Sequence, residues 1–209
     1  RLAARTYSEL AVSALRQDRL DDAESLEQKA LEMDRQSGAL PSPLTAAMRN
    51  NLADICLGQK RYVEAEQHYR EAIDIWESIL GKQHPDTAKA YMNLAKLYHL
   101  RQREAGAEEL YRRAAGIFSK VYGKDNLLTL VANNELADVL RAEGRYTESE
   151  RLGRTSLAGL RKQLRPDDPR LLHALENQER LLASTRRRKD AASLRDKIEQ
   201  VGRGFRTGE

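Results

Sequence analysis

The side chains that could do chemistry are few and scattered along the chain. The sequence holds four histidines, at His68, His84, His99 and His173. No two of them stand four residues apart, the spacing that would place two imidazoles on one helix face for a metal ion. The single cysteine, Cys56, occupies a repeating apolar position, which predicts a small buried side chain rather than a nucleophile. We therefore predict a protein that is not an enzyme and that holds no metal or cofactor.

Other motifs that suggest chemistry have simpler explanations. The 12 glycines are scattered and form no phosphate-binding loop. The basic run 186–189 is the best candidate for a nucleic-acid contact, but it has no interleaved aromatic residue to stack on bases, and Asp190 follows it directly. We expect a solvated turn there, and nucleic acid is not an expected partner.

The composition favours an all-helical protein. The 209 residues include 30 leucines and 27 alanines but only 12 valines and isoleucines together, which excludes a sheet protein. The longest apolar stretch, 127–132, is far too short to cross a bilayer. A single cysteine excludes an internal disulfide and leaves the compartment open, with the cytoplasm as the preferred expectation. Because the sequence starts at Arg1 rather than Met, we expect a piece of a longer or processed protein.

The sequence repeats itself every 42 residues. A Leu-Ala pair recurs at Leu10-Ala11, Leu52-Ala53, Leu94-Ala95 and Leu136-Ala137. Small residues keep the same step further along each unit, at Ala23, Ala65, Ala107, Ser149 and Ala191. A fixed period of this length is typical of proteins built from stacked repeats.

Each unit is predicted to fold as two helices joined by a short turn. Met48, Leu52 and Ile55 lie at i, i+4 and i+7, which gathers them on one helical face. The polar segment 58–61 interrupts that pattern, and apolar residues at helical spacing resume after it. The second helix is expected to end near Gly81, where glycine adopts the left-handed conformation at low cost.

We therefore predict an all-α chain of five antiparallel helix hairpins, about ten helices, in one domain over 1–201. The repeats are expected at about 1–41, 42–83, 84–125, 126–167 and 168–201. In the last repeat Gln178 and Glu179 replace the Leu-Ala pair, as expected of a polar capping repeat that faces water. Residues 202–209 are predicted to form a flexible tail.

These motifs resemble those of the tetratricopeptide repeat family. The family's pattern is an aromatic residue, Leu, a small residue and an aromatic residue, followed by Ala and another aromatic residue. In the third unit it is matched by Tyr91, Leu94, Ala95, Tyr98, Ala107 and Tyr111. The 42-residue spacing and the segments 50–53 and 84–87 are most similar to the long-helix subtype of kinesin light chains. The resemblance implies a right-handed α-solenoid, with the first helix of each repeat lining a concave groove, and a role as a protein-interaction scaffold.

The resemblance also implies where a partner would bind. The residues of each first helix that lie opposite the core are expected to face the groove. The predicted groove residues are Arg5, Ser8, Ala47, Asn50, Asp54, Lys89, Met92, Lys96, His99, Asn134, Asp138, Arg141 and His173. Asn50 and Asn134 match the family position whose amide commonly holds the backbone of an extended peptide, and an amide offers both donors and an acceptor for this.

The charge distribution indicates what kind of partner to expect. The net charges of 1–41, 42–83, 84–125, 126–167 and 168–209 are −2, −1, +3, +1 and +3. A ligand with acidic character should therefore prefer the later repeats, around Lys89, Lys96, His99 and Arg141. We predict a non-enzymatic scaffold that binds a partner peptide or segment with some acidic character.

Two other functions stay open at this point. The chain could be a structural self-assembly module that forms homo-oligomers through its terminal hairpins. It could also be the sensor arm of a larger signalling protein. The sequence does not predict the identity of the partner.

Overall fold

The computed structural model of the protein describes residues 2–38 and 40–206, with side chains up to residue 199. Within these ranges the chain forms ten α-helices and no strand. The helices are α1 (Leu2–Arg16), α2 (Leu20–Gln36), α3 (Pro43–Gly58), α4 (Tyr62–Leu80), α5 (Pro85–Leu100), α6 (Glu104–Tyr122), α7 (Leu127–Ala142), α8 (Tyr146–Gln163), α9 (Pro169–Ser184) and α10 (Arg188–Arg206). The predicted all-α fold with ten helices is confirmed.

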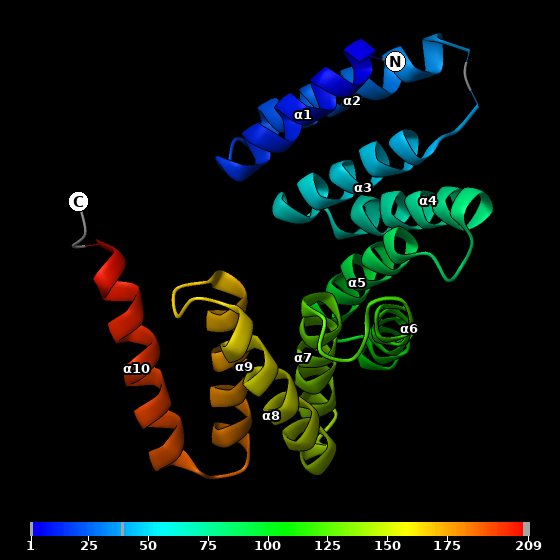
Figure 1. Cartoon of the computed structure of the whole chain (residues 1–209). Coiled ribbons are helices and arrows are strands. Elements are labelled where there is room, and N and C mark those ends of the chain that lie inside the picture. Colours follow the sequence, from blue (N-terminus) through cyan, green and yellow to red (C-terminus); the bar gives the residue numbers. More distant parts are fainter. Residues whose placement is uncertain (1, 39, 207–209) are drawn as a thin grey trace. The chain divides into compact units, whose positions relative to one another are not determined.

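The helices group into two compact units, Arg1–Leu97 and Tyr98–Glu209, whose boundary falls inside α5. In the first unit α1 pairs with α2, α3 pairs with α4, and α2 packs against α3 (Figure 1). In the second unit α6 packs against α7, the pairs α7–α8 and α9–α10 form hairpins, and α8 packs against α9 (Figure 1). Each unit thus stacks consecutive helix hairpins, as the repeat pattern predicts.

The first helices of repeats two to five begin at capping residues that stand 42 residues apart. These residues are Ser42, His84, Asn126 and Asp168. The Ser42 hydroxyl accepts a hydrogen bond from the Thr45 N–H, and the Thr45 hydroxyl accepts one from the Ser42 N–H, which makes a reciprocal capping box. At the other three positions the side chain accepts from the backbone N–H two residues on. The caps fix where each first helix starts, so the register is the same in these repeats.

The turn inside every hairpin also repeats with the same period. Its left-handed residue is Asp18, Lys60, Gln102, Gly144 or Arg186, with φ between 56° and 77°. Only Gly144 adopts this conformation without a Cβ clash, so the other four turns carry a strain of about 1 kcal/mol. Gly81 follows the end of α4, as the sequence predicts, but its φ of 88° and ψ of 160° place it in an extended positive-φ conformation rather than the predicted left-handed helical one.

The core consists of the small residues that recur every 42 positions and the apolar side chains around them. Ala53 on α3 and Ala65 on α4 are both fully buried. In the fourth hairpin the Ser149 hydroxyl donates a 2.6 Å hydrogen bond to the Ala137 carbonyl, so the two helix backbones lie close together. Cys56 is also fully buried, which confirms its prediction as a core side chain.

A repeating ion pair joins successive hairpins at their turns. Arg61 Nη1 lies 2.8 Å from a Glu24 carboxylate oxygen, and Arg145 Nη1 lies 2.8 Å from Glu108. Arg187 Nη1 lies 3.1 Å from Glu150. Arg187 belongs to the basic run 186–189, of which only the first two residues lie in the expected turn, because α10 begins at Arg188. The Arg187 side chain is engaged in contacts within the chain.

One boundary differs from the sequence prediction. The predicted flexible tail starts at residue 202, but α10 continues through Arg206, and 207–209 lie outside the described residues. A glycine inside a helix costs only about 1 kcal/mol, so Gly202 and Gly204 do not end it. Within the part of the chain that the structure describes, no helix is long and apolar enough to cross a membrane.

Replacing Lys60 by glycine should stabilise the protein. Lys60 is exposed and has φ 62°, so removing its Cβ relieves strain without losing a buried contact. We expect the free energy of unfolding, measured by urea denaturation, to rise by up to about 1 kcal/mol. Lys60→Val should lower it, and a stability ranking of valine above glycine would contradict the strain that we assign to this turn.

Candidate functional site

The predicted groove residues lie on α1, α3, α5, α7 and α9, and we call the surface around them the first-helix face of each unit. In the first unit this face is organised around Asn50. Its Oδ1 accepts a 2.9 Å hydrogen bond from Asn93 Nδ2 on α5, and its own Nδ2 donates to Asp54 at 3.3 Å. The Tyr69 hydroxyl donates to the other oxygen of Asp54. Burial raises the pKa of Asp54 against the effects of Tyr69 and the nearby Lys96. The Asn50 amide is thus already engaged within the chain.

The other predicted residues of the first unit are more loosely placed. Arg5 and Lys89 are exposed and form ion pairs on their own helices, at 2.9 Å from Glu9 and 2.9 Å from Asp86. Lys96 is exposed, and Ala47 and Met92 are half-buried. Exposed ion pairs of this kind contribute little stability, so the two cations can exchange partners readily.

Ser8 lies in the core of the first unit, because it bonds to a buried carboxyl group. The Ser8 hydroxyl donates to Glu27 Oε1 at 2.7 Å, and Asn51 Nδ2 donates to the Ser8 hydroxyl at 3.2 Å. Glu27 is fully buried, and its second oxygen, Oε2, has no hydrogen-bond partner among the described residues. Burial raises the pKa of Glu27 to about 7, against the hydrogen bonds from Ser8 and Asn51.

The buried Glu27 should make stability depend on pH. Since its pKa is about 7 in the fold and 4.5 ordinarily, the folded state loses stability as the pH rises from about 4.5 through 7. Glu27→Gln should remove this loss and raise the free energy of unfolding by up to about 3 kcal/mol at about pH 8, with little effect near pH 4. Chemical denaturation over this pH range would measure it. Glu9→Gln, on the exposed side of α1, is the control, and equal pH profiles for wild type and Glu27→Gln would contradict the assignment.

The first-helix face of the second unit is built around Asp138. Arg141 Nε donates to Asp138 at 2.6 Å, and Arg180 Nη2 on α9 donates to it at 3.2 Å. His99, in the last turn of α5, places Nε2 3.2 Å from the same carboxylate and Nδ1 2.5 Å from Glu104. Asp138 is only 7% exposed, so these three basic side chains gather around one nearly buried anion.

The protonation of this cluster follows from its contacts. Burial opposes ionisation of Asp138, but the bonds from His99 and Arg141 outweigh it and hold the pKa of Asp138 well below its usual range. The bond to Asp138 raises the pKa of His99 above its ordinary value; burial opposes this and Glu104 adds to it. Both ring nitrogens of His99 lie against carboxylate oxygens, which accept hydrogen bonds, so the cluster favours the charged imidazole.

Because the pKa of His99 is raised in the fold, its contribution to stability is present below about pH 6.5 and is lost as the pH rises through the folded-state pKa. We expect His99→Gln to lower the free energy of unfolding by roughly 1 kcal/mol at about pH 6. The difference from wild type should shrink by about pH 9. Thermal melts at the two pH values test this, and a difference that grew towards alkaline pH would exclude a charged His99.

A small cavity adjoins the Asp138 cluster where the fourth repeat lacks a side chain. Gly153 on α8 stands at the register position that Tyr69 and Tyr111 occupy in the preceding repeats. The cavity has a volume of about 10 Å³, the size that accommodates one water molecule, and Asp138, Gly153 and Asn177 are among its lining residues. The missing aromatic ring thus leaves a polar hollow within the second unit.

Two hydrogen-bond donors, one on a residue that lines this hollow and one on a side chain bonded to Asp138, lack an acceptor among the described residues. They are Nδ2 of Asn177, which is 5% exposed, and the buried Nε of Arg180. Arg180 Nη2 also donates to Asn177 Oδ1, so the two side chains are held together. Unpaired buried donors are costly, and an acceptor oxygen such as that of water, a carboxylate or a backbone carbonyl would satisfy them.

A second, more apolar pocket of about 220 Å³ lies on the same face. Val131, Leu160 and Pro169 are among its lining residues, and His173 also lines it. His173 Nε2 lies 3.1 Å from Glu135, and this contact raises the pKa of His173 against the effect of burial. Asn134, which is 3% exposed, lines both this pocket and the cavity at Gly153.

The structure brings together some predicted residues and separates others. His99, Asp138 and Arg141 share one cluster, and Asn50 and Asp54 share another. Ser8, Asn134 and Asp138 lie deeper than a solvent-facing groove position implies. Arg180 and Asn177 join the Asp138 cluster although neither is in the list of predicted groove residues. Arg180 stands 42 residues after Asp138, so the repeat register points to it.

The repeat pattern agrees with known protein families. Models described as "Tetratricopeptide repeat" match residues 8–78, 44–120 and 91–158. The chain belongs to the tetratricopeptide repeat family. No curated protein matches it by sequence.

Solved structures with this tetratricopeptide fold include proteins of the kinesin light chain type. A putative kinesin light chain from Podosopora anserina with nearly identical TPR-like repeats has a TM-score of 0.74 at 20% identity, covering 98% of this chain and 97% of that one. Its Q17M variant gives 0.76 at 21% identity, with 97% and 95% covered. BtubC (BKLC) from P. vanneervenii gives 0.79 at 19% identity, with 98% and 82% covered. These similarities confirm the predicted resemblance in fold to kinesin-light-chain-like repeats.

Proposed function

We propose that the first-helix face of the second unit binds an acidic segment of a partner protein. Tetratricopeptide repeats generally mediate protein–protein interactions, and the family match extends over both units. The finer proposal concerns what this particular face recognises. It rests on the donors and charges gathered around Asp138.

The unpaired donors of Asn177 and Arg180 are the observation that carries this proposal. An acceptor oxygen at the Gly153 hollow would satisfy Asn177 Nδ2, and a second acceptor beside Asp138 would satisfy Arg180 Nε, whereas an apolar group would leave both donors unsatisfied. Arg141, Arg180 and the protonated His99 outnumber the charges of Asp138 and Glu104, so the cluster favours an additional anion.

Other residues of the face extend the contact. Asn134 lines both the Gly153 cavity and the apolar pocket, and we assign it the role of hydrogen-bonding to the backbone of the bound segment. The apolar pocket beside it would hold an uncharged side chain of that segment. In the first unit the Asn50 amide must give up its hydrogen bonds to Asn93 and Asp54 before it can bond to a partner's backbone. We therefore propose that the first unit binds the partner more weakly than the second.

Selection from a random peptide display library on the wild-type protein tests the proposal. We expect the recovered peptides to be enriched in Asp and Glu. Arg180→Gln should weaken their binding at least about tenfold, because it removes a charge-assisted hydrogen bond worth roughly 1.5–3 kcal/mol. Fluorescence anisotropy with one recovered peptide measures the change.

Arg19→Gln, at the start of α2 in the first unit, is the matched control, since Arg19 is exposed and pairs locally with Asp22. It should leave the dissociation constant within about twofold of wild type. Peptides without acidic enrichment, or peptides that bind Arg180→Gln as well as wild type, would refute the proposed site.

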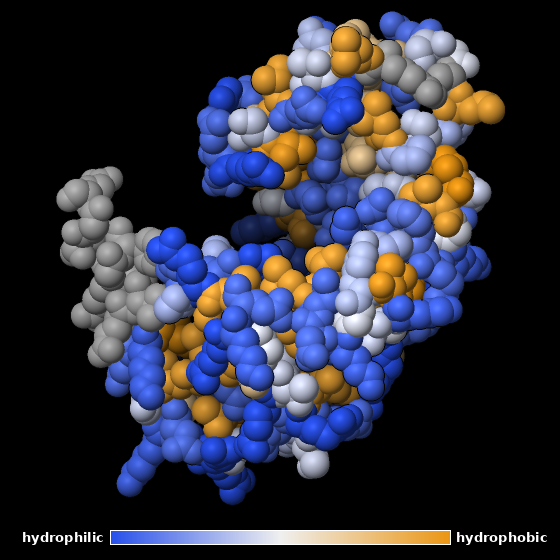
Figure 2. All heavy atoms as spheres, in the orientation of Figure 1, coloured by the Kyte–Doolittle hydropathy of each residue, from blue (hydrophilic) through white to orange (hydrophobic). Residues whose placement is uncertain are grey.

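Self-assembly through the terminal hairpins has less support. Met48 and Ile55 on α3 pack into clusters with the preceding hairpin, but Thr6 and Ser13 stand 42 residues earlier on α1. The stacking face of α1 is therefore polar at these positions, as expected of a cap. Figure 2 shows apolar patches over the α1–α2 hairpin at the top of the view, and α1 exposes Leu2 and Leu10. Light scattering over a concentration series distinguishes a monomer from an assembly.

A further inference from the structure

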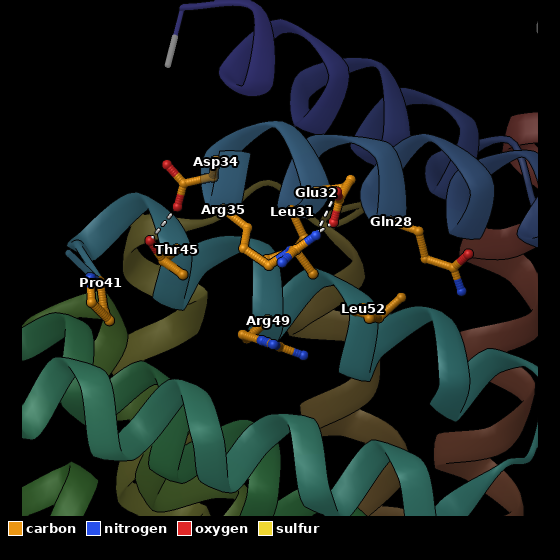
Figure 3. Close-up of a pocket in the computed structure, with 9 residues that line it drawn as sticks. All are labelled: Gln28, Leu31, Glu32, Asp34, Arg35, Pro41, Thr45, Arg49 and Leu52. Atoms are coloured by element: carbon orange, nitrogen blue, oxygen red, sulfur yellow. Dashed lines mark hydrogen bonds and ion pairs between the residues drawn. The ribbon is translucent and has the colours of Figure 1, made fainter. Parts of the chain in front are cut away.

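The structure contains a second type of groove, formed on the second-helix side of the repeats. In the first unit a pocket of about 370 Å³ lies between α2 and α3 (Figure 3). In the second unit a groove of about 560 Å³ runs between α6 and α8, with α7 as its floor. We call these the first and second outer grooves.

The two outer grooves are the same feature of the repeat. Eight of the nine residues that line the first groove stand 84 residues before a residue that lines the second. Thr45 corresponds to Thr129, for example, and Leu52 corresponds to Leu136. Since 84 is two repeat periods, the fold creates this groove at the same register position in both units.

The side chains along the two grooves differ in size. At three of the equivalent positions on the second helices the larger residue is in the first groove, and these pairs are Leu31 and Ala115, Glu32 and Gly116, and Arg35 and Ser119. Arg112, by contrast, is larger than its equivalent Gln28. In the first groove Arg35 bonds to Glu32 at 2.8 Å, and long side chains border the space (Figure 3). A side chain added at Gly116 would meet nothing within 4 Å, so the second groove is open there.

The second groove also has cations that the chain does not neutralise. Arg112 is engaged with Glu108 and Glu148, but Lys124 and Arg151 form no ion pair among the described residues. A neighbouring pocket along α8 continues the groove through Asp125 and Thr155 to Lys162, which forms no ion pair there either. Asp125 is the only lining anion without a cationic partner among the described residues of the two pockets.

We propose that the second outer groove is an additional protein-docking surface, and that its partner is an amphipathic helix with an acidic flank. The half-buried Leu152 offers apolar surface above the buried Leu136 and Leu140, and the absence of side-chain bulk at Ala115 and Gly116 admits the apolar ridge of such a helix. The cations Lys124, Arg151 and Lys162 form ion pairs with acidic residues along the flank of the bound helix. This surface is separate from the first-helix face and does not depend on the proposed function.

A synthetic amphipathic helix about 18 residues long, with Leu and Ala on one face and Glu on the other, is the probe. Fluorescence anisotropy should show saturable binding to the wild-type protein that weakens as salt is added. The double variant Ala115→Leu, Gly116→Glu closes the groove with the residues that the first repeat carries at these positions. We expect it to weaken binding at least about tenfold while circular dichroism stays unchanged.

A charge reversal tests the same surface without relying on the double variant's folding. Lys124→Glu combined with Arg151→Glu changes only exposed side chains, and it should abolish binding of the Glu probe while a matching Lys probe gains affinity. Arg180→Gln should leave binding of the Glu probe within about twofold of wild type, because Arg180 belongs to the first-helix face. This separates failure of the groove from failure of the proposed function.

Three outcomes would overturn the inference. The first is no saturable binding of the Glu probe to wild type, and the second is unchanged binding by folded groove-closing and charge-reversal variants. The third is a concentration-dependent dimer, seen by sedimentation, that the groove-closing variant dissociates, since the occupant would then be a second copy of this chain.

Discussion

The close approach of two helices at a pair of small residues is the constraint on which the structure depends. The small residues Ala11, Ala23, Ala53 and Ala65 are all fully buried. At the same register in the fourth hairpin the Ser149 hydroxyl reaches the Ala137 carbonyl at 2.6 Å, so the two helix backbones lie close together there. The 42-residue period of these residues, reinforced by caps and turns with the same period, makes every hairpin nearly the same. A given register position then always lies at the same place in its repeat.

That constancy lets side chains at one position create different local chemistry. At a single position of the second helix the chain has Glu27, Tyr69, Tyr111 and Gly153. Glu27 is a buried carboxyl with a raised pKa, Tyr69 bonds to Asp54, and burial holds the pKa of Tyr111 well above its ordinary value. Gly153 leaves a hollow lined by Asn177, whose Nδ2 has no acceptor among the described residues. The candidate site of the second unit therefore arises where the repeat departs from its own pattern.

The sequence could predict the hairpins and their order because periodicity and small residues report directly on helix packing. It could also indicate which residues share the first-helix face, and it placed His99, Asp138 and Arg141 together. It could not predict how deeply each would lie, because burial of Asn134 and Asp138 depends on side chains from the neighbouring helices. Pairing within the chain, such as Asn50 with Asn93, was also beyond a pattern that treats each repeat separately. The sequence did not predict the second outer groove. That groove exists because Ala115 and Gly116 are small, and small residues form no apolar or charged motif that a sequence pattern could show.

The central claim is that a partner supplies the hydrogen-bond acceptor that Arg180 Nε and Asn177 Nδ2 lack. The NMR resonance of the Arg180 Nε group tests this claim most directly. We predict that adding an acidic peptide shifts this resonance and slows exchange of its proton with water, while the Nε resonance of Arg19, which donates to Asp22 in the first unit, stays in place. An acidic peptide that binds, as judged by backbone resonances, but leaves Arg180 Nε unchanged would contradict the account.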